Sequence, residues 1–368
     1  MDLADLRNDV PALAAETYLN WGASGPSPTR TVDAIEETLE RFEYDAPTAE
    51  GMYPAAVAVF EETRETVAEF VGADDAEIAL TQSTTDAINR VATAIDWRPG
   101  DEVVITDIEH AAGRLPWYRL ARDVGIEVTE LETHRGEINP EEFAAAVEGA
   151  RLACFSAVDW LYGRRHPVET LVDVAHDADV LTLVDAVQVP GHLSMDVDAW
   201  GADLVAAAGH KWLLGPWGAG FLYVDADVAD DLRPGAVGYR GVEDPNAEAV
   251  TYRPGARRFE VGTTNPAPYA GLQAAIETVQ QVGQERITGT IMELTARLKA
   301  EIPDERLRSP EPFHSGLVSI EADDPAATVE RLSAAGVHIR SLPVPETVRV
   351  SVHAVNTAAD VDAFLDVF

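Results

Sequence analysis

The sequence predicts an α/β fold, in which a three-layer α/β/α large domain with a mostly parallel sheet precedes a smaller α+β C-terminal domain. Short apolar runs alternate with amphipathic stretches from residue 77 onwards, which is the pattern of strands joined by helical crossovers. These runs are apolar throughout, as expected when helices cover both faces of the sheet. The chain has 368 residues, more than one hydrophobic core usually fills, so two domains are expected.

The expected elements follow in chain order. Residues 1–30 are rich in Gly, Pro and Ser and are expected to be irregular, and helical patterns follow at 30–43 and 54–71. Strands are expected at 77–82, 102–106, 127–131, 152–158, 181–186, 203–208 and 220–224. Helices are expected between them at 85–94, 115–124, 140–147 and 168–178.

The last third of the chain has a different pattern. Residues 239–268 have weak periodicity and many Pro, Gly and Arg residues, and a loop this long within a domain is more often functional than idle. A helix is expected over 268–300, followed by strands at 316–320, 337–340 and 348–352. These elements predict the α+β unit at the C-terminus.

The charge balance excludes several classes of partner. The chain has 27 Lys+Arg against 64 Asp+Glu, a formal net charge of −37. A surface this acidic repels phosphate backbones and anionic lipids, so neither nucleic-acid nor membrane binding is expected. A hydrophobic content of 46% still allows a large core. Basic residues comprise 25 Arg and only two Lys, a composition that resembles proteins of halophilic microbes.

The N-terminal sequence and the single cysteine indicate a cytoplasmic protein. No basic segment followed by an apolar stretch marks a signal peptide, and no apolar run approaches the roughly 18–20 residues of a membrane helix. Cys154 is the only cysteine, so an internal disulfide and a cysteine-rich metal site are excluded, and we expect no metal.

One of the two lysines, Lys211, lies at a position where an amine could act as a nucleophile. Lys211 follows an apolar strand and opens a glycine-rich turn. An amine can form a Schiff base, whereas a guanidinium stays protonated and is a poor nucleophile. A surface lysine in a turn is the alternative. Lys299, on the expected helix 268–300, is expected to be an ordinary exposed residue.

Polar residues end other predicted strands. Asp185 ends the strand 181–186, at the edge where open α/β sheets bind ligands, and Gln188 follows it. Such an Asp could hydrogen-bond a protonated ring nitrogen, although a helix N-cap explains it equally well. Ser83 and Thr84 precede a predicted helix, where hydroxyls and free N–H groups form either a phosphate site or a simple cap. His110 follows another strand and is either structural or placed to stack on a planar ring.

Together these residues resemble the class V aminotransferase and cysteine desulfurase superfamily of pyridoxal-phosphate (PLP) enzymes, which have the fold type I architecture. The resemblance runs from about Tyr18 to the C-terminus, with the motifs in the family's order. Its most specific segments are Gly209-His-Lys-Trp-Leu-Leu-Gly-Pro-Trp-Gly-Ala-Gly, Arg258-Phe-Glu-Val-Gly-Thr-Thr-Asn265 with Gly271-Leu-Gln-Ala-Ala-Ile, and Val348-Arg-Val-Ser-Val-His-Ala-Val-Asn-Thr357.

The resemblance implies a role for each of the residues that bind the cofactor. Lys211 would form the Schiff base and move the Cα proton, while Asp185 would keep the ring nitrogen protonated, which makes the ring an electron sink. His110 would stack on the ring and Gln188 would contact its phenolic oxygen. The phosphate would be held by Ser83, Thr84, His210 and, across the interface of a homodimer with a shared active site, Thr263.

The resemblance also implies how the substrate and the domains are arranged. Arg349 would bind the α-carboxylate of a small amino-acid substrate, a task suited to the bidentate geometry of a guanidinium, with Ala23 and Arg340 beside it. The N-terminal segment 1–30 would be associated with the active site and the small domain. Residues 31–265 would form the large PLP-binding domain and 266–368 the small domain.

The sequence departs from the family pattern in three places. The stretch before Arg349 lacks the nucleophilic loop cysteine of the desulfurases, and Cys154 lies within an apolar strand. Ala208 stands where the family often has a Ser donor to the phosphate. Trp160 occupies the position of a cofactor-contacting Asn, after Asp159, whose role stays open. Arg164 and Arg165 follow directly; with Arg340 they could bind an acidic or anionic substrate, or they could be surface ion-pair partners.

Aminotransfer is the first expectation for the reaction. Cysteine or selenocysteine lysis and an isopenicillin-N-epimerase-like epimerisation are alternatives, because all begin with the same Cα chemistry. A non-catalytic binding protein with the PLP fold is a further alternative, which the presence of Lys211, Asp185 and Arg349 disfavours. A dinucleotide-binding enzyme is excluded because no Gly-x-Gly-x-x-Gly turn follows the first predicted strand.

Overall fold

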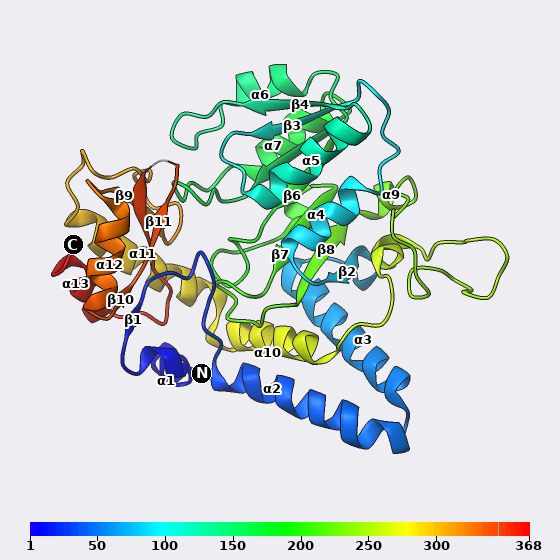
Figure 1. Cartoon of the computed structure of the whole chain (residues 1–368), viewed down its shortest axis with the longest axis horizontal. Helices are drawn as coiled ribbons and strands as arrows, with labels where there is room; N and C mark the ends of the chain where they lie inside the picture. The colour runs from blue at the N-terminus through cyan, green and yellow to red at the C-terminus, as the bar shows by residue number, and fades with distance from the viewer. Residues whose placement is uncertain (345) are drawn as a thin grey trace.

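The computed structural model describes residues 1–344 and 346–368, and its centre is a seven-stranded sheet (Figure 1). The strand order is β2-β8-β7-β6-β5-β3-β4, and β8 runs antiparallel to both of its neighbours. The strands are β2 (Ile78–Thr81), β3 (Glu102–Thr106), β4 (Glu127–Leu131), β5 (Leu152–Ser156), β6 (Leu181–Asp185), β7 (Leu204–Ala208) and β8 (Gly220–Val224). The predicted α/β class with a mostly parallel sheet is confirmed.

Two hydrophobic cores cover the two faces of this sheet. Alternate residues of β5 belong to different cores: Phe155 packs with one face and Cys154 with the other. This division is expected because successive side chains of a strand point to opposite faces. The first core includes α3 (Met52–Val71), α6 (Pro140–Val147), α7 (Val168–His176) and α10 (Ala267–Val282); the second includes α4 (Thr84–Ala92) and α5 (Ala111–Asp123).

A second sheet lies at the other end of the molecule, on the left of Figure 1. It has the order β11-β12-β9 and is antiparallel. Its strands are β9 (Leu317–Glu321), β11 (Arg340–Leu342) and β12 (Thr347–Ser351), and nearby helices are α11 (Gln284–Ala300), α12 (Pro325–Ala334) and α13 (Ala358–Leu365). β1 (Thr17–Tyr18) pairs in parallel with β10 (Val337–His338), which ties the N-terminal segment to this end. The predicted domain boundaries themselves stay a prediction.

Three sequence-based expectations about helices were wrong. Residues 1–30 are not wholly irregular, because α1 (Leu3–Asn8) begins with the Asp2 side chain accepting the Asp5 N–H. The helix expected over 268–300 is two helices, which break at Gly283 with a φ of 93°, a conformation that favours glycine. α5 begins at Ala111, four residues before the expected start.

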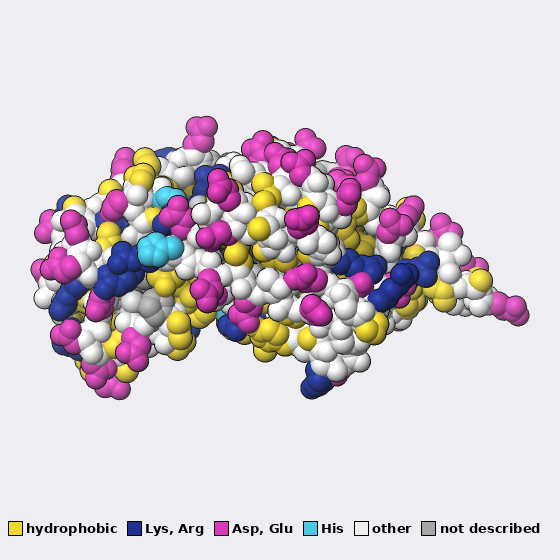
Figure 2. Space-filling model, turned by 90° about the horizontal axis from the view of Figure 1, so that it is seen from above, with side chains coloured by type: hydrophobic (Ala, Val, Ile, Leu, Met, Phe, Trp, Pro, Cys, Tyr) yellow, Lys and Arg dark blue, Asp and Glu magenta, His cyan; other side chains and the backbone are white. Residues whose placement is uncertain are grey.

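The remaining α-helices are α2 (Thr29–Glu40), which packs beside α10, and the short α8 (Val197–Trp200) and α9 (Ala226–Ala229). The long segment expected to be a loop is indeed mostly irregular, with one short 3-10 helix at Gly255–Phe259, and part of it projects at the right of Figure 1. Acidic side chains are spread over the face seen in Figure 2, where basic ones occupy a few positions. Within the described residues, no helix is long and apolar enough to cross a bilayer.

Candidate active site

The site forms at the carboxyl ends of the parallel strands, the edge where open α/β sheets bind ligands. Ser156, the last residue of β5, pairs with Asp185, the last residue of β6, which in turn pairs with Ala206 on β7. The loops that leave this edge carry Ser83 after β2, His110 after β3 and Lys211 after β7. Residues that are far apart in the sequence are thus brought together by strand register.

A cavity of about 160 Å³ lies at this edge. Every residue predicted for the site except Thr263 lines it: Ala23, Ser83, Thr84, His110, Asp185, Gln188, His210, Lys211, Arg340 and Arg349. The N-terminal segment closes one wall, since Gly25 donates its N–H to the His210 carbonyl at 2.8 Å. A Cβ at Gly25 would lie 2.2 Å from the Lys211 carbonyl oxygen, so only glycine allows this approach.

The Lys211 amine faces the cavity, and no described group accepts a hydrogen bond from its Nζ. Burial and the positive charge of Arg349 lower the pKa of this amine to about 7, while the negative charge of Asp185 acts in the opposite direction. An amine with such a pKa is largely neutral at slightly alkaline pH and is therefore a nucleophile.

Asp185 is buried below the cavity, where only one of its carboxylate oxygens has a partner. Its Oδ1 accepts the Val187 N–H at 3.0 Å, and no described donor reaches Oδ2. No helix begins at Asp185, so the N-cap alternative fails. Burial raises the pKa of this carboxyl, and the Lys211 charge opposes the rise. A cationic ring nitrogen at Oδ2 would stabilise its ionised form.

One end of the cavity has the donors that a phosphate needs. Ser83 is the N-cap of α4, and its Oγ accepts the Asp86 N–H at 3.1 Å, which leaves its own O–H available to donate. The Oγ1 of Thr84 is buried without a partner among the described residues. His210 also lines the cavity, and burial, with the charge of Lys211, lowers its pKa to about 4, so its imidazole is neutral. The N-terminus of α4 and the hydroxyls of Ser83 and Thr84 together offer the hydrogen-bond donors that an anion such as phosphate needs.

The aromatic rings of His110 and Trp160 lie next to each other in the lining of the cavity. The His110 Nδ1 accepts the Ala112 N–H at 3.3 Å, and its ring centre lies 5.3 Å from that of Trp160 in an edge-to-face arrangement. Burial, with the charges of Lys211 and Arg340, lowers the pKa of His110 to about 4. The imidazole is therefore neutral, which allows it to stack on a cationic ring without charge repulsion.

Two arginines enter the cavity from the small sheet. Arg340 on β11 and Arg349 on β12 are directly opposite each other in the antiparallel register, so their side chains leave on the same face. Arg349 is 1% exposed; its Nη1 donates to the Trp160 carbonyl at 2.8 Å, while Nε and Nη2 have no partner among the described residues. Burial and Arg340 lower the pKa of Arg349 to about 9. Unpaired donors beside a like charge call for an anionic ligand.

The Gln188 side chain lines the cavity and also hydrogen-bonds to two other parts of the chain. Its Oε1 accepts the Trp212 Nε1–H at 2.7 Å and its Nε2 donates to the Gly22 carbonyl at 3.1 Å. The second N–H of this amide remains for a ligand. Gln188 thereby joins the segment after Lys211 to the N-terminal segment at the cavity wall.

Thr263 is the one predicted residue that lies elsewhere. Its Oγ1 is 3.0 Å from the Tyr239 hydroxyl, and it lines a different cavity of about 240 Å³ with Arg90, Arg240 and Glu260. A contribution to the same chain's cavity is therefore not observed. The prediction that Thr263 reaches a partner subunit stays a prediction.

Asp159 holds a turn and does not contact the cavity. Its carboxylate accepts the backbone N–H groups of Leu161, Tyr162 and Arg164 at 2.8, 2.5 and 2.7 Å. Trp160 lines the cavity with an unpartnered Nε1. Arg164 and Arg165, considered as substrate-binding groups from the sequence, do not line this cavity.

Sequence reasoning missed several lining residues, including Gly22, Thr85 and Ser156. Ser156 could have been found, because it ends β5 beside the end of β6. It also donates its N–H and O–H to the buried Glu109 carboxylate, at 3.1 and 2.5 Å. Burial raises the pKa of Glu109 to about 7, and the charge of Asp185 adds to that rise.

The residues present fit PLP. A neutral amine without a partner, a carboxylate oxygen without a donor and an orphaned buried Thr84 hydroxyl at a helix N-terminus match the aldehyde, the ring nitrogen and the phosphate of that cofactor. Ala208 offers only a methyl group, so a Ser donor at that position is absent. The remaining donors are still sufficient for one phosphate.

Comparisons with known proteins agree with this geometry. The family Aminotransferase class-V matches residues 17–364. A probable cysteine desulfurase from Methanothermobacter thermautotrophicus is 34% identical to this chain, and the alignment covers 98% of this chain and 96% of the desulfurase. An apo cysteine desulfurase structure from Thermococcus onnurineus has a TM-score of 0.91 at 29% identity, covering 99% of this chain and 96% of its own.

A solved structure of the cystine C–S lyase C-DES, in complex with its product cysteine persulfide, has a TM-score of 0.91 at 26% identity. It covers 97% of this chain and 98% of its own, and another C-DES structure contains glycine linked covalently to the PLP cofactor. With the match over nearly its whole length and the fit of its cavity to the cofactor, the chain belongs to the class V aminotransferase family of PLP-dependent enzymes.

Proposed function

We propose that this enzyme is a PLP-dependent lyase that cleaves the C–S bond of a disulfide amino acid such as L-cystine by β-elimination, without an enzyme cysteine. Arg340 and Arg349 lie opposite each other in one cavity, and neither has an ion-pair partner among the described residues. Nε and Nη2 of Arg349 also lack hydrogen-bond partners, and this unsatisfied pair of cations is the observation that carries the proposal. An α-amino acid with a second carboxylate at its far end satisfies both.

The position of the single cysteine supports a cysteine-independent reaction. Cys154 lies in the middle of β5, is 1% exposed, and burial raises the pKa of its thiol, so it is neither accessible nor a thiolate. The segment that joins β11 to β12 spans residues 343–346 and contains no cysteine. The sulfur must therefore leave on the substrate, which a disulfide substrate permits.

The reaction then needs no sulfur acceptor on the enzyme. Cleavage of the Cβ–S bond of cystine releases cysteine persulfide, and the three-carbon fragment leaves, after addition of water, as pyruvate and ammonia. Cysteine persulfide is the product named for C-DES, whose structure resembles this chain. The relatives named cysteine desulfurase support sulfur chemistry more than aminotransfer, which is the first expectation from the sequence.

The site residues divide the work of this reaction. Bound PLP supplies an electron sink that stabilises negative charge at Cα. Lys211 would hold the cofactor and accept the Cα proton, which its low pKa favours. Asp185 would hold the proton on the ring nitrogen. Ser83, Thr84 and His210 would bind the phosphate, while neutral His110 would flank the ring.

The two arginines orient the substrate. Arg349, held by the Trp160 carbonyl, would bind the α-carboxylate through its two free donors. Arg340 would bind the distal carboxylate. Ala23 lines the same cavity, and its small side chain would leave room for the substrate.

A homodimer with Thr263 reaching the partner's phosphate completes the proposal. Thr263 is exposed on a mostly irregular segment and is not required by its own chain's cavity. Sedimentation of the holoenzyme tests the oligomeric state, and a fully active monomer would refute the shared site.

The reaction is tested with the holoenzyme and a panel of L-cystine, L-cysteine and L-alanine, with and without a 2-oxo acid. We expect pyruvate and persulfide sulfur from L-cystine, independent of the 2-oxo acid. Amino-group transfer to the 2-oxo acid, without sulfur release, would establish aminotransfer instead. Production of a D-amino acid would establish epimerisation.

A matched pair of substrates tests the role of Arg340. S-(Methylthio)-L-cysteine has the same disulfide as L-cystine but lacks the distal carboxylate. Arg340→Gln should raise the KM for L-cystine about tenfold, which corresponds to the loss of one charge-assisted hydrogen bond. The KM for S-(methylthio)-L-cysteine should stay nearly unchanged. An equal effect on both substrates would contradict the proposed contact.

A further inference from the structure

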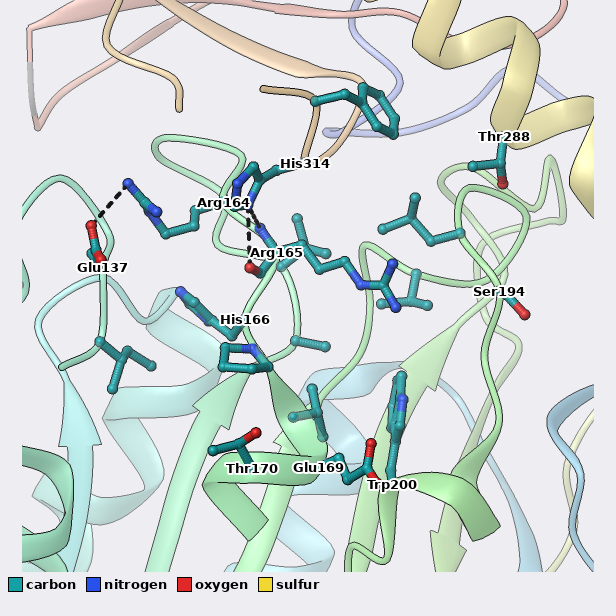
Figure 3. Close-up of a pocket in the computed structure, with 18 of the residues that line it drawn as sticks. Glu137, Arg164, Arg165, His166, Glu169, Thr170, Ser194, Trp200, Thr288 and His314 are labelled. Carbon is teal, nitrogen blue, oxygen red and sulfur yellow. Dashed lines mark hydrogen bonds and ion pairs between the residues drawn. The ribbon is translucent and has the colours of Figure 1, made fainter. Parts of the chain in front are cut away.

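A second and larger cavity lies beside the active site, with a volume of about 780 Å³ (Figure 3). Its walls come from the turn at 164–167 and the first residues of α7 that follow it, from the segment that follows β6, from α11 and from Phe313 and His314. It therefore lies between the elements of the large sheet and the chain that leads into the small sheet. None of the proposed catalytic residues lines it.

The charges in this cavity leave one cation free. Arg164 pairs with Glu137 at 3.4 Å and points away from the centre, as Figure 3 shows. The backbone N–H and carbonyl of Arg165 each lie 3.3 Å from His314 Nδ1, but its guanidinium has no ion pair or hydrogen bond among the described residues and extends across the cavity. In a chain with 64 acidic and 27 basic residues, an arginine without a carboxylate partner is available to an external anion.

The rest of the lining suits the organic part of such a ligand. Leu193, Met292 and Phe313 contribute apolar surface, and the Trp200 ring lies across from Arg165. The remaining carboxylate, Glu169, lies beside Trp200 at the far end (Figure 3). An anionic group is therefore favoured only at the Arg165 end, which sets one orientation for the ligand.

The turn that carries Arg165 also touches the active site. Trp160, in the same turn, lines the active-site cavity and accepts a hydrogen bond from Arg349 through its carbonyl. Asp159 binds three N–H groups of the turn, and both ring nitrogens of the buried His166 lie near carbonyl oxygens, of Ser156 at 2.6 Å and of Gly136 at 2.8 Å. These hydrogen bonds connect Arg165 to the carbonyl that positions Arg349, so a shift of Arg165 on ligand binding would be transmitted to that carbonyl through the turn.

We propose that this cavity is a binding site for an organic anion with an apolar body, in which Arg165 binds the anionic group, and that its occupancy changes the affinity of the active site for its amino-acid substrate. The site lies outside the proposed catalytic residues, and ligand binding there does not depend on which reaction the enzyme catalyses.

The binding test uses 1-naphthalenesulfonate, with neutral 1-naphthalenemethanol as its match, and PLP-loaded enzyme. Because the one natural cysteine is buried, Met292→Cys would provide a single accessible thiol in the cavity, and protection of that thiol from alkylation reports occupancy. We expect the sulfonate to protect it, with affinity lowered about fivefold by Arg165→Gln. Arg286→Gln, which removes an arginine of α11 outside the cavity, is the control and should have no effect.

The coupling test measures the KM for the amino-acid substrate with and without the sulfonate. We expect the sulfonate to change KM and leave kcat unaltered, and Arg165→Gln to weaken this effect. The proposed site would be overturned if the sulfonate gave no protection of the thiol. It would also be overturned if the protection were equal in the Arg165→Gln and Arg286→Gln backgrounds, or if the neutral alcohol protected the thiol as well as the sulfonate does. Protection without a change in KM would overturn the link to Arg349. A wild-type enzyme that binds PLP but converts no amino acid refutes the proposed function and leaves the binding result intact.

Discussion

The chain has only two lysines, and the two regions that contain them differ in how the amine is satisfied. Lys299 on α11 is 8% exposed, and its Nζ donates to the Pro310 carbonyl at 2.6 Å. The prediction of an ordinary exposed residue was wrong for it. Lys211 faces a cavity, has no acceptor among the described residues, and lies between one carboxylate and two guanidinium groups.

Burial alone therefore does not mark the functional lysine. Burial lowers the pKa of both amines, but Lys299 has a fixed partner and a structural task. Lys211 has a lowered pKa and no acceptor among the described residues, and it lines a cavity whose other residues include hydrogen-bond donors suited to a phosphate and a carboxylate. Both amines are buried, and the one without a hydrogen-bond partner, Lys211, is the group that a cofactor needs.

The largest expected effect comes from removing the unsatisfied amine. Lys211→Ala should abolish the visible absorbance of the PLP-loaded protein and its activity, because no other amine lines the cavity. Lys299→Met is the matched control and should retain both. If Lys299→Met lost the visible band while Lys211→Ala kept it, the assignment of the two lysines would be reversed.

Arg349 should give the next largest effect. Arg349→Gln removes the two unpaired donors and is expected to lower kcat/KM by a factor on the order of 10 to 100, mainly through KM. Circular dichroism checks that the fold remains, since the residue is buried in β12. An unchanged KM would show that the substrate carboxylate binds elsewhere.

The pKa of Lys211 predicts the pH dependence of cofactor capture. The neutral amine is the reactive form, so the rate at which apoprotein gains visible absorbance should rise with pH through about 7 and level off above it. Arg340→Gln removes a positive charge that lowers this pKa, and the midpoint should move to higher pH. Stopped-flow absorbance measures both profiles, and a midpoint near the usual lysine value of 10.5 in the wild type would contradict the environment described for Lys211.

The smallest functional effect should come from Lys299. Lys299→Met leaves the Pro310 carbonyl without its donor and should lower the free energy of unfolding by about 1–3 kcal/mol. Chemical denaturation measures this loss, and PLP absorbance should be unaffected. A change in KM with unaltered stability would contradict the structural role.

Much of the site could be predicted because parallel strands end at one edge. Asp185, Ser83 and Lys211 each follow a strand-like run, so their meeting needs only the strand order. The pairing of Arg340 with Arg349 depends on the register of a hairpin, which periodicity does not set. The role of each of these residues stays a prediction from the family resemblance.

Other features required tertiary packing to become visible. The hydrogen bond of Lys299 depends on the carbonyl of Pro310, which lies outside α11 and is brought to the amine only by the tertiary fold. Arg164 and Arg165 are adjacent in sequence, yet one is paired and the other free, because the carboxylate of Glu137 is close only to the first. A helical pattern over 268–300 continues through Gly283, whose positive φ breaks the helix without a change in amphipathicity.

The central claim, C–S lysis without an enzyme cysteine, is tested most directly by removing the only thiol. Cys154→Ala holoenzyme contains no cysteine, and alanine is accepted in the core of β5 at a modest cost in stability. We predict that it releases pyruvate and persulfide sulfur from L-cystine at the wild-type rate. Loss of sulfur release in a folded, PLP-loaded Cys154→Ala protein would contradict the account.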